Sequence, residues 1–264
     1  MHYQGVILDV DGTVLHGSEP IDGAKRGLAA VDTAGLSRVF VSNNPTAVPA
    51  AYEERFDAAG FSVGRDEVRT AGTLTTAYLA AEHSEDVLFV IGDDGVVEQL
   101  SAAGLSLTTD PEAADTLVVS IDRDFSYESL CNAIVALADE ETEFIGTDPD
   151  MLIPHRGWNR PGTGAMLHAI EGVTGRSVDV VCGKPSEFAA EAALEHLDLP
   201  ARDCLVVGDR LDTDIALGSN AGMMTALVLT GVTDAETLAA SDIKPDFVLD
   251  SVGELGSVLD GTHG

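Results

Sequence analysis

The stretch Val6–Thr13 (VILDVDGT) is the most informative indication of the fold of this chain. An apolar run typical of a buried strand ends in Asp9 and Asp11, and Gly12 follows at once. Side chains alternate along a strand, so both aspartates point the same way until the backbone turns at the glycine. Paired carboxylates at the carboxyl end of a buried strand lie where open α/β sheets bind ligands. Because like charges this close repel, the pair predicts a cation or a shared proton beside it.

Three further strand ends carry polar side chains. Residues 39–44 (VFVSNN) place Ser42 and Asn43 after an apolar run. Lys184 stands between glycine and proline. Because the 264 residues include only three lysines, Lys184 is less expected to be a surface residue without a function. The apolar residues 204–208 lead into Asp209, and Asp214 follows in an acidic helix start. Aspartate in a first helical turn is also ordinary capping, which is the expected role of Asp212. For Asp214 the alternative is a carboxylate on the helix surface.

Taken in chain order, these positions supply two carboxylates, a hydroxyl, a lysine and a second acidic group. The set resembles the four motifs of the haloacid dehalogenase (HAD) superfamily, and the likeness spans nearly the whole chain. Residues 183–186 (GKPS) and 208–215 (GDRLDTDI) are more similar to its NagD-like and p-nitrophenylphosphatase-like branch. The resemblance implies a phosphatase that hydrolyses a small phosphorylated metabolite through an aspartyl phosphate.

The resemblance also assigns roles to the motif residues. Asp9 would be the nucleophile, and Asp11 would protonate the leaving alcohol and later activate water. Mg²⁺ would be held by Asp9, Asp209 and the backbone carbonyl of Asp11. The remaining expected roles are phosphoryl binding by Ser42, Asn43 and Lys184, and orientation of Lys184 or a metal-bound water by Asp214.

Other functions on the same scaffold stay open at this point. A dehalogenase attacks carbon and needs no metal site, so Asp11 together with Asp209 speaks against that activity. A phosphomutase is disfavoured only by the likeness to one branch. A non-catalytic phosphometabolite-binding protein would not need the acid at Asp11.

The rest of the chain alternates between predicted strands and helices, which indicates an α/β fold with a doubly wound parallel sheet. Strands are expected over 4–9, 38–42, 87–91, 116–121, 143–146, 204–208, 224–229 and 246–249. Helices are expected over 23–34, 47–59, 72–82, 94–103, 127–138, 162–174, 186–196, 212–220, 234–240 and 251–259. In the NagD-like branch an α/β cap is inserted between the second and third motifs. The expected domains are therefore a core of residues 1–74 and 182–264 and a cap of residues 75–181.

The segment 147–164 is the expected source of substrate contacts in the cap. It resembles the cap loop that often reads T-N-x-D in this branch, with Asp150 at the acidic position and Asp148 in place of the asparagine. Arg156 and Trp158 could bind an anionic or planar substrate. A plain surface loop with the tryptophan packed beneath it is an equally open interpretation.

Charge limits the partners and the setting. The formal charge is −31, from 45 acidic and 14 basic residues, which disfavours nucleic acid and anionic lipid as partners. An acidic, lysine-poor surface predicts a halophilic protein, kept soluble in concentrated salt. The N-terminus leads straight into the first strand, so a cytoplasmic location is expected. Since relatives of this branch often pair, a homodimer is also left open.

Overall fold

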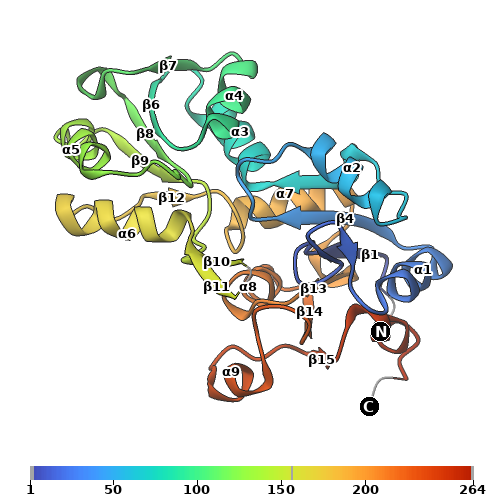
Figure 1. The fold of residues 1–264 in the computed structure, drawn as a ribbon. Coiled ribbons are helices and arrows are strands. Elements are labelled where there is room, and N and C mark those ends of the chain that lie inside the picture. The colour runs from blue at the N-terminus through green and yellow to red at the C-terminus, as the bar shows by residue number, and fades with distance from the viewer. Residues whose placement is uncertain (1–2, 156, 263–264) are drawn as a thin grey trace. The chain divides into compact units, whose positions relative to one another are not determined.

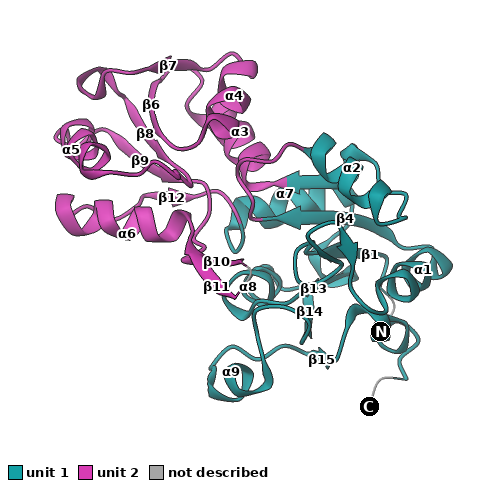
Figure 2. Cartoon of the chain, viewed as in Figure 1, with its two compact units in different colours: residues 1–42, 49–69, 184–264 teal, residues 43–48, 70–183 magenta. Residues whose placement is uncertain are grey.

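The computed structural model describes residues 3–155 and 157–262 (Figure 1). The chain divides into two compact units, which Figure 2 colours separately. The first comprises residues 1–42, 49–69 and 184–264, and the second comprises residues 43–48 and 70–183. The expected cap range, 75–181, lies inside the second unit, which also includes a few flanking residues and the short segment 43–48.

A six-stranded sheet in the order β15-β14-β13-β1-β4-β5 forms the centre of the first unit. The paired strands from β15 to β4 run parallel. All residues of β1 and β13 are buried, as expected when helices cover both faces of a parallel sheet. The strands are β1 (Gly5–Leu8), β4 (Ser37–Ser42), β5 (Val68–Thr70), β13 (Cys204–Gly208), β14 (Met224–Val228) and β15 (Phe247–Leu249).

Helices of this unit pack against one another and against the sheet. They are α1 (Ala24–Ala34), α2 (Pro49–Ala58), α7 (Glu187–Leu197), α8 (Ala216–Ala221), α9 (Ala235–Ala240) and α10 (Leu255–Leu259). Helix α1 packs against α10, whereas α7 packs against α8 and β4. A small hairpin, β2 (Leu15–His16) with β3 (Glu19–Pro20), follows the first strand. Short 3₁₀ turns lie at η1 (Arg65–Glu67), η3 (Ala201–Asp203) and η5 (Val252–Glu254).

A five-stranded parallel sheet in the order β12-β9-β8-β6-β7 forms the centre of the second unit. On β8, Leu117 and Val119 pack into one apolar cluster and Val118 into another, so both faces of the sheet are covered. The strands are β6 (Val87–Ile91), β7 (Ser106–Thr108), β8 (Thr116–Val119), β9 (Glu143–Gly146) and β12 (Val180–Val181). The helices are α3 (Ala71–Glu82), α4 (Asp94–Ala102), α5 (Tyr127–Ala136) and α6 (Thr163–Thr174), with a 3₁₀ turn at η2 (Pro111–Ala113). The third helix packs against α4, and α5 packs against α6.

An antiparallel hairpin in the second unit was not expected from the sequence. Strand β10 (Leu152–His155) pairs with β11 (Trp158–Pro161) in the segment 147–164. Among the described residues, no helix is both long and apolar enough to cross a membrane.

Candidate active site

The site begins where the central strand of the first unit ends. Strand β1 lies between β13 and β4, and Leu8 is in register with Val207 on one side and Phe40 on the other. The carboxyl ends of these three parallel strands therefore meet at one edge of the sheet, where α/β folds bind ligands. Asp9 continues β1, and its N–H donates to the Val207 carbonyl over 2.9 Å.

A buried lysine holds two of the expected site residues together. Lys184 Nζ donates to Asp9 Oδ1 and to Asp214 Oδ1, each over 2.6 Å, and to the Val41 carbonyl over 2.7 Å. The lysine is 2% exposed, so its charge is almost removed from water. Burial alone lowers the pKa of Lys184, but the Asp214 and Asp9 carboxylates outweigh burial and raise it. The lysine is therefore charged at neutral pH.

Asp214 has partners on both oxygens. It lies in a π-helical turn, η4 (Leu211–Ile215), which begins the helical segment that continues as α8. Its Oδ1 accepts from Lys184, and its Oδ2 accepts from the N–H of Arg210 over 3.0 Å. A Cβ atom on Gly208 would collide with this carboxylate, which explains a glycine at the end of β13. Asp214 is thus a buried site group and not a helix-surface carboxylate.

Asp209 joins the same acidic group. It is 1% exposed, and its Oδ2 accepts from the N–H of Val232 over 2.6 Å. Burial raises the pKa of Asp209 to about 7, and the nearby charge of Asp214 adds to the effect. Gly12 permits the close approach, because it has φ +93° and its Cβ atom would lie 2.6 Å from Asp209 Oδ2.

These carboxylates could hold a divalent cation. Oxygen atoms of Asp9, Asp209 and Asp214 all lie within 4.8 Å of one another. Among the residues that the structure describes, no hydrogen-bond partner reaches the buried Asp9 Oδ2. Burial raises the pKa of Asp9 well above its usual range, and the charges of Asp214 and Asp209 add to the rise, against the opposing effect of Lys184. Three carboxylates face one ammonium, which leaves an excess of negative charge that a hard cation would offset.

Side chains of helix α2 contact both Ser42 and Asp11. Ser42 Oγ lies 2.7 Å from the hydroxyl of Tyr52, and both residues are buried. Asp11 accepts from Arg55, which reaches Oδ1 over 2.5 Å and Oδ2 over 3.3 Å. Burial raises the pKa of Tyr52 to about 12, so its hydroxyl keeps its proton. Sequence reasoning missed Tyr52 and Arg55, although arginine is scarce in so acidic a chain.

The second unit contains the other expected site residues. Asn43 Nδ2 donates to Asp150 Oδ1 over 3.1 Å, which ties the loop after Ser42 to the segment 147–164. Asp148 is 2% exposed and accepts from the hydroxyls of Thr147 and Thr163. Burial raises the pKa of Asp148 to about 7, with a further contribution from Asp150.

The hairpin in this segment presents its tryptophan to solvent. Trp158 is 58% exposed, so the expectation of a tryptophan packed beneath a surface loop is wrong. The guanidinium carbon of Arg160 lies 5.5 Å from the centre of the Trp158 ring, and the His155 ring lies 5.3 Å away. Arg156 lies outside the described residues.

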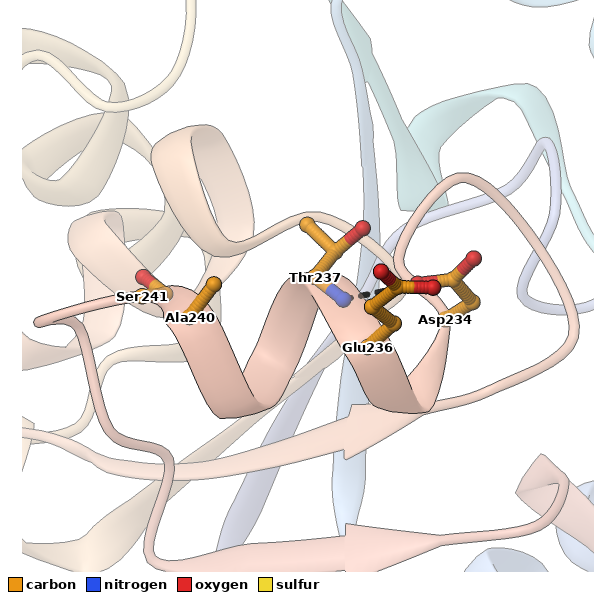
Figure 3. Close-up of a pocket in the computed structure, with 5 residues that line it drawn as sticks. All are labelled: Asp234, Glu236, Thr237, Ala240 and Ser241. Atoms are coloured by element: carbon orange, nitrogen blue, oxygen red, sulfur yellow. Dashed lines mark hydrogen bonds between the residues drawn. The ribbon is translucent and has the colours of Figure 1, made fainter.

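An open pocket elsewhere in the first unit contains none of the expected site residues. It lies on α9 (Figure 3) and is lined by Asp234, Glu236, Thr237, Ala240 and Ser241. Asp234 caps this helix by accepting from the N–H of Thr237 over 2.8 Å, which accounts for its position.

Known proteins are similar to this chain over nearly its whole length. Residues 6–106 match the family described as Haloacid dehalogenase-like hydrolase, and residues 181–255 match one described as HAD-hydrolase-like. The sugar-phosphatase AraL of Bacillus subtilis is 33% identical over 251 residues, which cover 95% of this chain and 91% of AraL.

Solved structures are similar over the same extent. A p-nitrophenyl phosphatase from Archaeoglobus fulgidus is 36% identical, with a TM-score of 0.91 over 98% of this chain and 100% of the other. NagD from E. coli K-12 is 29% identical, with a TM-score of 0.85 over 96% of this chain and 98% of NagD.

Proposed function

Since the chain belongs to the haloacid dehalogenase-like hydrolases and is a phosphatase of phosphate monoesters, we propose that it works through an aspartyl phosphate on Asp9. The observation that carries this proposal is the asymmetry of the Asp9 carboxylate. Its Oδ1 is held by Lys184, and its buried Oδ2 has no hydrogen-bond partner within residues 3–155 and 157–262. One oxygen is thus fixed while the other is left for a ligand.

The proposed sequence of steps uses two aspartates. An oxygen of Asp9 attacks phosphorus, and the bond to the leaving alcohol breaks as Asp11 gives the alcohol its proton. Asp11 then takes a proton from water, which attacks phosphorus and releases phosphate from Asp9. Lys184 stabilises negative charge on the phosphoryl oxygens, and Ser42 and Asn43 donate hydrogen bonds to them. Asp214 holds Lys184 in place.

A divalent ion is part of this proposal, and we assign it as Mg²⁺. The donor set fits, since Asp9 and Asp209 belong to one cluster of carboxylates and one buried oxygen of Asp9 has no hydrogen-bond partner in the described part of the chain. The side chains of Asp9 and Asp209 and the carbonyl of Asp11 would hold the ion. Asp214 fits a supporting role better, because both of its oxygens already have partners. When bound, Mg²⁺ would supply positive charge that offsets the charge of the phosphate dianion and of the carboxylates.

The proposed substrate is a small phosphorylated metabolite, such as a sugar phosphate. The name of AraL, a sugar-phosphatase, supports this class. Asp150, Arg156 and the hairpin residue Trp158 are the proposed substrate contacts in the second unit. The proposed setting is the salt-rich cytoplasm of an extreme halophile, which the charge of −31 supports. A homodimer is also proposed, without nucleic acid or membrane partners.

An assay of phosphate release tests this function. The wild type in molar KCl with Mg²⁺ should release phosphate from p-nitrophenyl phosphate and from a panel of sugar phosphates. Asp9→Asn should lose about 10³-fold or more of this activity while its circular dichroism spectrum is unchanged. Turnover within tenfold of wild type in the variant would remove Asp9 as nucleophile. Transfer of phosphate to another alcohol, without free phosphate, would favour a phosphomutase.

A further inference from the structure

Arg55 makes a two-point contact with the proposed acid–base residue. This arginine lies on α2, and its two terminal nitrogens reach Asp11 Oδ1 over 2.5 Å and Oδ2 over 3.3 Å. The same guanidinium donates to the Gly17 carbonyl from Nη2 over 2.7 Å and from Nε over 3.1 Å. Gly17 lies in the turn between β2 and β3, so Arg55 connects Asp11 to the hairpin that follows it.

Packing fixes the arginine itself. The guanidinium carbon of Arg55 lies 4.8 Å from the centre of the Tyr52 ring, and residues three apart share one face of a helix. Tyr52 is 0% exposed, and its hydroxyl contacts Ser42 over 2.7 Å. One face of α2 therefore contacts both the proposed phosphate-binding serine and the proposed acid–base aspartate.

Asp11 needs such a support more than the other site residues do. Its side chain is 49% exposed, whereas Asp9, Asp209 and Lys184 are all buried. An acid–base group must lie within hydrogen-bond reach of the proton that it transfers. An exposed aspartate without a partner would sample several rotamers and spend little time in the productive one.

We infer that Arg55 is a positioning residue that orients Asp11 for both proton transfers, with Tyr52 as the platform beneath the guanidinium. The inference rests on the proposed function. The contact can persist through the reaction, because a protonated carboxyl group keeps an oxygen that accepts from arginine. A surface ion pair that served stability alone would contribute little to folding, and its loss would affect the turnover of all substrates equally.

The test compares two kinds of leaving group in Arg55→Met, which removes the guanidinium and keeps an unbranched stem. Nitrophenolate departs without a proton, so kcat/KM for p-nitrophenyl phosphate should stay within about threefold of wild type. The kcat for p-nitrophenyl phosphate should fall about tenfold or more, because activation by Asp11 of the water that hydrolyses the intermediate is impaired. An alkyl phosphate needs the proton, so its kcat/KM should also fall about tenfold or more.

Two further variants complete the experiment. Arg65→Met removes another arginine that pairs with α2, at Glu53, but that arginine is 68% exposed, and the variant should behave as wild type on both substrates. Arg55→Lys keeps the positive charge but loses the planar guanidinium that contacts both carboxylate oxygens. The difference between the two substrates in their loss of kcat/KM should therefore be smaller than in Arg55→Met. Arg55→Lys also serves as the readout if Arg55→Met does not fold.

The outcomes separate this inference from the proposed function. An equal loss of kcat/KM on both substrates, or no loss in kcat on either, would overturn a positioning role for Arg55. If wild type releases phosphate and Asp9→Asn does not, the proposed function stands whatever the arginine variants do. If Asp9→Asn remains active, the proposed function fails first.

Discussion

Lys184 Nζ lies 2.6 Å from Asp9 Oδ1, while the other oxygen of that carboxylate is buried without a hydrogen-bond partner in the described part of the chain. The lysine also pairs with Asp214, so one ammonium supports two carboxylates. This arrangement leaves Asp9 anchored at one oxygen, while its other oxygen is open to the ion or the phosphoryl group of the proposed reaction.

Removal of the lysine should destabilise the first unit strongly. Lys184→Met leaves Asp9 and Asp214 buried without their cation, and breaking a buried pair typically costs about 3–5 kcal/mol of unfolding free energy. Urea unfolding with EDTA present measures the effect. Lys244→Met is the matched control, since that lysine is exposed, and it should stay within about 1 kcal/mol of wild type. A Lys184→Met variant as stable as this control would contradict the account.

Mg²⁺ should stabilise the folded protein independently of turnover. An ion that binds only the native state adds about 2.7 kcal/mol at 100 times its Kd, so the melting temperature should rise with Mg²⁺. Asp209→Asn should abolish this rise. Asp212→Asn should keep it, because Asp212 lies in the same acidic turn with its side chain 71% exposed. The same Mg²⁺-dependent rise in Asp209→Asn would place the ion elsewhere.

Asp148 should make stability depend on pH. Its pKa is raised to about 7 by burial and by Asp150, so the folded state binds this proton more tightly than the unfolded state. The stabilisation is complete below the ordinary pKa of aspartate and is lost as pH rises through about 7. Asp148→Asn, which cannot ionise, should melt higher than wild type at pH 8 and near it at pH 4. If the melting temperatures of Asp148→Asn and wild type differed by the same amount at pH 4 and at pH 8, the raised pKa of Asp148 would be refuted.

Salt should stabilise the whole chain. Repulsion among the carboxylates that give a charge of −31 opposes folding, and the Debye length falls to ~3 Å at 1 M salt. The melting temperature and the rate of phosphate release should therefore rise from dilute buffer into molar KCl. A melting temperature that is flat or falls with KCl would remove the halophilic interpretation and leave the phosphatase assignment intact.

The α/β fold was predictable because its strands are short apolar runs between amphipathic helices. The expected strand over 204–208 is β13 with the same bounds, and the expected helix over 186–196 begins and ends within one residue of α7. The helix expected over 212–220 is a π-helical turn followed by α8, a distinction that periodicity cannot make. The hairpin β10–β11 was missed because most of its residues are exposed and the alternation of buried and exposed side chains is absent.

The site was predictable only in part. Asp9, Lys184, Asp209 and Asp214 follow motif positions, and the structure brings all four together. The contact of Arg55 with Asp11 joins residues 44 apart in the chain, and no local pattern encodes it. Basic residues are scarce in this chain, and this scarcity draws attention to Arg55 as much as to Lys184. It does not show which carboxylate Arg55 contacts.

Chemical trapping of the phosphoenzyme identifies the residue that carries the phosphoryl group. Asp11→Asn should slow hydrolysis of the intermediate more than its formation from p-nitrophenyl phosphate, because nitrophenolate needs no acid. Borohydride reduction of this variant during turnover, followed by peptide mass spectrometry, should find homoserine at position 9. Homoserine at another aspartate, or none in a sample that still releases nitrophenolate, would contradict an aspartyl phosphate on Asp9.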